Sequence, residues 1–193
     1  MKRTLNPPQI VILSFAGVIL AGAFLLMVPF SLSGRSFISF VDALFTATSA
    51  VCVSGLTVQY TVCFFSTFGQ TCIISLIQLG GLGIMTYSTI FAVLLGRRFT
   101  IRQNVLIQSA LDAESVKGMR ILIRYIILLT VVLEAIGVFF LFMKWSDCFR
   151  HSSFAVLYQS VFHVVSAFCN AGFSLFSDNL TSFRGDIITN VII

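Results

Sequence analysis

The feature that most constrains this chain is a long stretch without charge. No Asp, Glu, Lys or Arg occurs between Asp42 and Arg97. One membrane-spanning helix needs only about 20 apolar residues, so this stretch is longer than a single span requires. Its interior contains "TSAVCVSGLTVQYT", residues 48–61, which is too polar for a span and too apolar for an ordinary exposed loop. We therefore expect two hydrophobic helices with a polar loop between them at membrane depth.

The composition indicates the surrounding solvent. The chain is 58% hydrophobic and 10% charged, with a mean hydropathy of +1.01. A soluble domain contains about 25% charged residues, so the composition predicts an integral membrane protein. The apolar run at residues 10–30 is longer than the roughly 7–15 residues of a signal-peptide core, and we expect it to be a span of the mature protein.

The net charge of +5 is placed in a way that predicts orientation. Lys2 and Arg3 precede the first apolar run, and a further group of Arg and Lys lies between residues 97 and 124. Basic residues accumulate on the cytoplasmic side of membrane proteins. We therefore expect a multi-pass protein of the cell membrane whose N-terminus and 97–118 connector are cytoplasmic. No segment offers the exposed basic face of a nucleic-acid-binding protein.

The apolar segments fall into two length classes. The runs that are long enough to span a bilayer lie at residues 10–30, 65–95 and 119–143. The helices expected at residues 42–50 and 154–167 are too short to span it. Asp42 is expected to cap the first short helix, because a carboxylate can accept the free N–H groups at a helix N-terminus.

Topology then predicts a re-entrant segment. An even number of crossings must separate the N-terminus from the connector, and two spans with residues 42–60 entering and leaving by the outer face satisfy this. The predicted fold class is an all-α membrane protein built of tandem span–pore-helix–span units. The parts are a first unit at residues 1–96, the connector at 97–118, and a second unit at 119–193 whose closing span is truncated.

The two short helices belong to an internal repeat. "FTATSAVCVSGLT" at residues 45–57 aligns without a gap with "FHVVSAFCNAGFS" at residues 162–174. The identical pairs are Phe45 and Phe162, Ser49 and Ser166, Ala50 and Ala167, Cys52 and Cys169, and Gly55 and Gly172. Both copies have the same orientation, whereas inverted repeats would favour a secondary transporter with a midplane site coupled to protons or sodium.

The repeated loop has the chemistry of a cation filter. A dehydrated cation needs oxygen ligands, which rings of backbone carbonyls supply. Glycine allows the backbone to turn those carbonyls to one side, and the negative end of a short helix favours a cation nearby. The alternative is that the loop is a tight packing turn between helices. The presence of two matched copies makes this the weaker interpretation.

The chain resembles the Trk/Ktr/HKT superfamily of potassium transporters, and within it the bacterial KtrB-type membrane subunits. The resemblance rests on "DALFTATSAVCVSGL" (residues 42–56), "LIQLGGLGIMT" (76–86) and "FHVVSAFCNAGFSLFSDNL" (162–180). The family implies units arranged around one pore, with potassium as the transported ion and sodium as the alternative ion. Gly55 favours potassium, since serine at this position accompanies sodium permeation in the family.

The resemblance also implies site residues and partners. Carried over by position, the filter carbonyls are those of Cys52, Val53, Ser54, Gly55, Cys169, Asn170, Ala171 and Gly172. The implied assembly is a homodimer in membrane lipid, bound to a cytosolic nucleotide-binding regulatory subunit. The family carries four filter loops and this sequence carries two, which favours a truncated reading frame. A non-conducting fragment and an ion-coupled secondary transporter remain the alternative functions.

Other polar residues predict structural roles. Glu134 lies in the middle of a predicted span, where a carboxylate is either a coupling site or hydrogen-bonded to a pore-helix end or nearby backbone. The glycines in "GGLG" are expected to permit close helix packing, and His163 is expected to be a hydrogen-bonded structural residue. Cys63 and Cys148 are expected on the outer side, as free thiols or as a pair. No catalytic constellation is present in the sequence, so no enzyme activity and no cofactor are expected.

Overall fold

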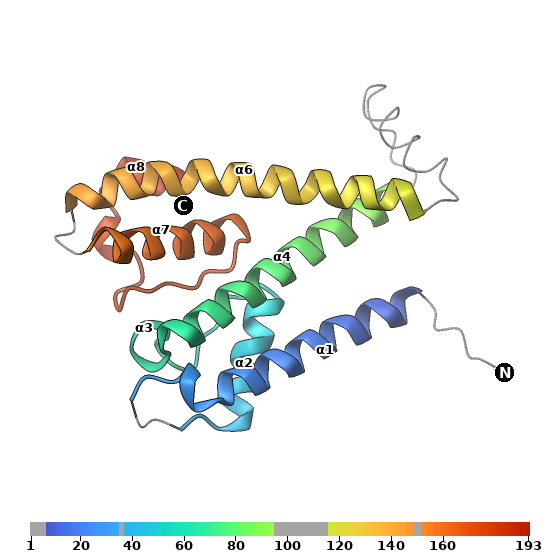
Figure 1. Ribbon diagram of the computed structural model, residues 1–193, viewed down its shortest axis with the longest axis horizontal. Helices are drawn as coiled ribbons and strands as arrows, with labels where there is room; N and C mark the ends of the chain where they lie inside the picture. Colours follow the sequence, from blue (N-terminus) through green and yellow to red (C-terminus); the bar gives the residue numbers. More distant parts are fainter. Residues whose placement is uncertain (1–6, 35–36, 95–115, 149–151) are drawn as a thin grey trace. The chain divides into compact units, whose positions relative to one another are not determined.

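The computed structural model describes residues 7–34, 37–94, 116–148 and 152–193. In these residues the regular secondary structure is helical, and one isolated bridge joins Leu32 and Phe65. The α-helices, shown in chain order in Figure 1, are α1 (Pro7–Met27), α2 (Phe40–Val51), α3 (Thr61–Phe64), α4 (Thr67–Leu94), α6 (Val116–Cys148), α7 (Ser153–Phe168) and α8 (Ile187–Ile192). Two 3₁₀ turns, η1 (Pro29–Ser31) and η2 (Thr181–Phe183), lie between them.

The expected first span is helix α1, which has 21 residues and so extends about 31 Å. The helix ends at Met27 because Val28 precedes a proline, a position that disfavours helical backbone. Ser31, fully buried, donates from its hydroxyl to the carbonyl oxygen of Leu25 at 2.6 Å. This bond fixes the turn by which the chain leaves α1.

The first short helix, α2, begins earlier than the sequence predicted. It covers Phe40–Val51 instead of residues 42–50, and its N-cap is Ser39, whose side chain accepts a hydrogen bond from the backbone N–H of Asp42 at 3.1 Å. The prediction that Asp42 is the cap was therefore wrong. Serine with extended backbone is a preferred cap, whereas Asp42 lies in the first turn, where its charge still favours the positive helix end.

Two of the described helices are long and apolar enough to cross a membrane, over Thr67–Thr86 and Ile123–Ser146. They belong to α4 and α6, which correspond to the spans predicted at residues 65–95 and 119–143. Most of the 97–118 connector lies outside the described residues. A helical membrane protein is thus consistent with both the sequence and the structure.

The described chain forms two compact units. One contains residues 1–81 and 137–193, and the other contains residues 82–136. The first unit includes both short helices and both repeated loops, and its main core joins α1, α2, the start of α4 and the end of α7. Within this unit α7 runs back alongside the 137–148 end of α6 (Figure 1), and Leu141 and Trp145 pack against Val156 and Val164. The division into repeat units at residues 1–96 and 119–193 concerns sequence repetition and stays a prediction.

Candidate functional site

The helices α2 and α7 end in the same way. At the end of α2 the backbone N–H of Ser54 donates to the carbonyl oxygen of Ser49 at 3.0 Å, and at the end of α7 Ala171 donates to Ser166 at 2.7 Å. The preceding residues complete the pattern, since Val53 donates to Ala50 at 3.4 Å and Asn170 donates to Ala167 at 2.8 Å. This pair of bonds is the Schellman motif, which requires a left-handed residue directly after the helix cap.

The left-handed residue is not glycine in either copy. It is Val53 with φ 57° after α2 and Asn170 with φ 61° after α7. Asparagine tolerates this conformation, but a β-branched residue there is a genuine outlier. Such strain costs on the order of 1–3 kcal/mol and clusters at functional sites. No sequence pattern predicted this conformation, because positive φ was expected only at glycine.

Glycines follow two residues later, and there the two loops meet. Gly55 has φ 74° and Gly172 has φ 70°. A Cβ on Gly55 would lie 2.8 Å from the carbonyl oxygen of Ala171 and 3.5 Å from the Cα of Gly172. The structure thus brings the ends of the two repeated loops into backbone contact, and the absence of a Cβ at Gly55 permits it.

Gly80 and Gly81 of "GGLG" pack against the ends of the two short helices. A Cβ on Gly80 would lie 2.0 Å from the carbonyl oxygen of Val51, the last residue of α2. A Cβ on Gly81 would lie 2.6 Å from the Sγ of Cys169, the C-cap of α7. Both glycines therefore permit close packing, as predicted, and adjacent positions of α4 contact the ends of both short helices.

Side-chain hydrogen bonds hold the second loop. The hydroxyl of Ser166 donates to the carbonyl oxygen of Phe173 at 2.7 Å. The Nε2 atom of His163 lies 3.0 Å from the Oγ of Ser174 and 3.2 Å from the backbone nitrogen of Leu175. His163 is thus hydrogen-bonded as the sequence predicted, and its bonds reach the chain directly after Gly172.

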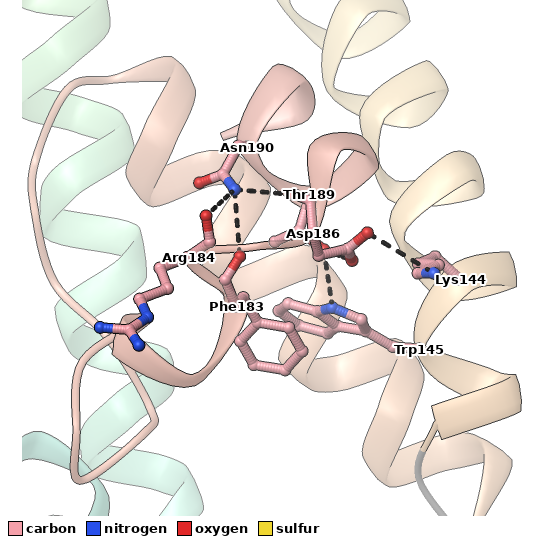
Figure 2. Close-up of polar contacts among 7 residues, drawn as sticks. All are labelled: Lys144, Trp145, Phe183, Arg184, Asp186, Thr189 and Asn190. Atoms are coloured by element: carbon pink, nitrogen blue, oxygen red, sulfur yellow. Dashed lines mark hydrogen bonds and ion pairs between the residues drawn. The ribbon is translucent and has the colours of Figure 1, made fainter.

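A polar network links α8 to the end of α6 (Figure 2). The indole N–H of Trp145 donates to the hydroxyl of Thr189 at 3.3 Å, which donates to the carboxylate of Asp186 at 2.6 Å. The hydrogen bond from Thr189 lowers the pKa of the Asp186 carboxyl, and the Nζ of Lys144 lies 3.5 Å from the same carboxylate. The side-chain nitrogen of Asn190 donates to the carbonyl oxygens of Phe183, Arg184 and Asp186. The start of α8 is thereby tied to the loop that precedes it and to α6.

The predicted filter residues differ in exposure. Cys52, Ser54, Asn170 and Gly172 are exposed, Val53 and Gly55 are half-buried, and Cys169 and Ala171 are buried. The Sγ of Cys169 points to α4, where it lies 3.7 Å from the Oε1 of Gln78. Residues of both repeats therefore lie together, with their backbones in contact at Gly55 and Gly172.

The remaining predicted residues are Glu134, Cys63 and Cys148. Glu134 is half-buried in α6, within the compact unit of residues 82–136. Cys63 is an exposed free thiol, and the side chain of Cys148 lies outside those that the structure describes.

Comparison with known proteins identifies the class and then the family. A family model described as "Cation transport protein", TrkH, matches residues 2–193, and the chain belongs to this family of membrane transport proteins, which are not enzymes. It is 41% identical over 188 residues to the Ktr system potassium uptake protein B of Bacillus subtilis (strain 168), covering 97% of this chain and 41% of that protein. It is 43% identical over 180 residues to the protein of the same name from Vibrio alginolyticus, covering 93% of this chain and 38% of that one.

A third relative is named for two ions. The potassium/sodium uptake protein NtpJ of Enterococcus hirae is 36% identical over 194 residues, which cover 100% of this chain and 42% of that protein. The chain therefore spans about two fifths of the length of the curated relatives it matches.

Proposed function

We propose that this chain forms part of the potassium-conducting pore of a Ktr-type uptake system in the cell membrane. In this proposal α2 and α7 are pore helices, and the carbonyls of residues 52–55 and 169–172 are filter ligands. The observation that carries the proposal is the pairing of the repeats. Two helices too short to span a membrane end in the same motif, and their loops meet at Gly55 and Gly172.

The electrostatics of the two helix ends favour a cation. Each C-terminus carries roughly half an elementary negative charge. The two loops follow those ends directly, since Cys52 and Cys169 are the C-caps of α2 and α7. Backbone oxygens held by such ends can replace water around a dehydrated ion. Potassium is the proposed ion because two relatives are named potassium uptake proteins, and sodium is the alternative because a third is named for both.

The decisive experiment uses the protein as its gene encodes it, in cells that lack other potassium uptake. The wild-type protein should restore growth on low potassium. Gly55→Ser should abolish that growth while sodium uptake rises, because an added side chain at this turn changes the orientation of the carbonyls. The matched control is Cys52→Ala, which keeps the carbonyl and shortens an exposed side chain, so uptake should change little.

Each result has a clear meaning. Unchanged uptake and ion preference in Gly55→Ser, with the protein present in the membrane at the wild-type level, would overturn the filter assignment. Equal losses in Gly55→Ser and Cys52→Ala would indicate a packing turn instead of a filter.

The proposed assembly is a homodimer with a cytosolic nucleotide-binding regulatory subunit. Relatives named as parts of a Ktr system include an uptake protein B and an uptake protein D. Co-purification of the protein with a soluble subunit, and an uptake rate that responds to a nucleotide, would support this assembly. A protein that is fully active alone and insensitive to nucleotides would exclude it.

A further inference from the structure

His163 is a buried polar side chain whose hydrogen bonds connect α7 to the segment after the second loop. It lies in α7, is 1% exposed, and contacts hydrogen-bonding atoms on both of its ring nitrogens. Nδ1 lies 2.8 Å from the carbonyl oxygen of Gln159, one turn earlier in the same helix. Nε2 reaches Ser174 and Leu175, which follow the repeated loop. His163 therefore joins the helix to the chain that leaves the proposed filter.

The partners determine which nitrogen carries the proton. A backbone N–H can only donate, so Nε2 must accept from Leu175 at 3.2 Å. The carbonyl oxygen of Gln159 can only accept, so Nδ1 carries the hydrogen and donates to it. Ser174 Oγ accepts from the backbone N–H of Phe176 at 3.0 Å and can donate its hydrogen to Nε2. One neutral tautomer, with the hydrogen on Nδ1, fits these contacts, and the single lone pair of Nε2 is shared between the N–H of Leu175 and the hydroxyl of Ser174.

Aromatic side chains hold the ring in this orientation. Phe176 stacks on it with ring centroids 4.7 Å apart, and Trp145 meets it edge to face at 5.2 Å. Trp145 is itself fully buried and bonded to Thr189 of α8 (Figure 2). Rotation of the imidazole away from Leu175 would therefore require the surrounding side chains to move.

The first repeat lacks this bridge at the equivalent position, which is Thr46. Its hydroxyl donates to the carbonyl oxygen of Asp42, within the same helix, at 2.8 Å. In the first loop the hydroxyl of Ser54 donates to that of Ser49 at 3.0 Å. In the second repeat, by contrast, the side chains of Ser166 and His163 form hydrogen bonds with three consecutive residues, 173–175.

We propose that His163 is a positioning residue that holds Ser174 and Leu175 in place and thereby sets the discrimination between potassium and sodium in the second loop. The proposal rests on the filter function proposed above. Selectivity of a carbonyl site depends on the spacing and number of its oxygens. A loop whose outgoing segment can shift will adapt to the smaller ion, so loss of the Nε2 acceptor should weaken discrimination more than it weakens uptake.

The test compares two polar substitutions that keep different atoms of the imidazole. In His163→Gln the side-chain oxygen can reach the place of Nε2 and accept from Leu175. In His163→Asn the side chain reaches only the place of Nδ1, so the N–H of Leu175 loses its partner. The readout is the ratio of potassium to sodium uptake in membrane vesicles, together with the amount of protein in the membrane.

We expect His163→Gln to keep the wild-type ratio and His163→Asn to lower it by on the order of tenfold, the effect of one buried hydrogen bond. Thr46→Val is the matched control, because it changes the equivalent position and removes only a bond within α2. Its ratio should equal that of the wild type.

Equal ratios in His163→Gln and His163→Asn would overturn the proposal. If His163→Asn does not reach the membrane, Ser174→Ala decides instead: a lowered ratio supports the proposal and an unchanged ratio overturns it. Gly55→Ser in the same assay separates this inference from the proposed function. If Gly55→Ser loses discrimination while the His163 pair does not, the filter stands and the role of His163 falls.

Discussion

Gly55 and Gly172 lie in backbone contact, such that a Cβ on Gly172 would lie 3.4 Å from the Cα of Gly55. The contact is not symmetric, because a Cβ on Gly55 would lie only 2.8 Å from the carbonyl oxygen of Ala171. The two loops of the repeat therefore share backbone torsions but differ in how tightly each is enclosed.

This asymmetry predicts a graded effect of alanine. Gly55→Ala should reduce potassium uptake more strongly than Gly172→Ala, because only the first places a methyl group closer to a backbone oxygen than real Cβ atoms come. Both should act in the same direction, and Gly172→Ser should likewise resemble Gly55→Ser. The measurement is the initial rate of potassium uptake per amount of protein in the membrane.

A matched control separates strain from contact. Gly34 also has a positive φ, 75°, but a Cβ there would meet nothing within 4 Å. Gly34→Ala introduces similar backbone strain, of about 1 kcal/mol, and should leave uptake unchanged. A loss in Gly34→Ala equal to that in Gly55→Ala would mean that strain alone explains the effect.

The second prediction concerns the left-handed residues. Asn170→Val places a β-branched residue at φ 61° on an exposed position and should destabilise the protein by about 1–2 kcal/mol. Asn170→Gly should be neutral or slightly stabilising, since glycine adopts this conformation freely. Thermal unfolding in detergent would measure the difference. Equal unfolding midpoints for the two variants would contradict the left-handed conformation of residue 170.

The third prediction concerns the support of the first loop by α4. Gly80→Ala should destabilise the protein by about 1–3 kcal/mol or more, because a methyl group would overlap the carbonyl oxygen of Val51. Gly17→Ala in α1 is the matched control, because nothing lies within 4 Å of the added atom. That variant should be neutral or slightly stabilised by helix propensity. Equal thermal stability of both variants would show that α4 does not approach α2 as described.

The fourth prediction concerns orientation in the membrane. A reporter inserted in the connector at residues 97–118 should be cytoplasmic, and one inserted at residues 144–151 should be external, because basic residues cluster around the connector. Accessibility to an impermeant label in intact cells distinguishes the two sides. An external connector would exclude the re-entrant arrangement of residues 42–60.

The sequence by itself determined the long apolar helices and the repeat. The uncharged run between Asp42 and Arg97 predicted hydrophobic helices on either side of a polar loop. The recurrence of "SA", "C" and "G" after a short apolar segment predicted that α2 and α7 would be alike. These features depend on residue type and on the spacing of nearby residues, both of which can be read from the sequence. The helix cap was missed because Ser39 and Asp42 are both good N-terminal residues, and their relative position is a detail of local geometry.

Only the tertiary structure decided how the two copies are used. The positive φ of Val53 could not be predicted, because its intrinsic preference opposes that conformation and the surrounding packing overrides it. Three features join segments that are far apart in the sequence. They are the contact between Gly55 and Gly172, the packing of the α4 glycines against the ends of α2 and α7, and the hydrogen bond from Leu175 to His163. Their geometry follows from how helices pack in three dimensions, where a single Cβ or a single ring nitrogen determines which backbones can meet.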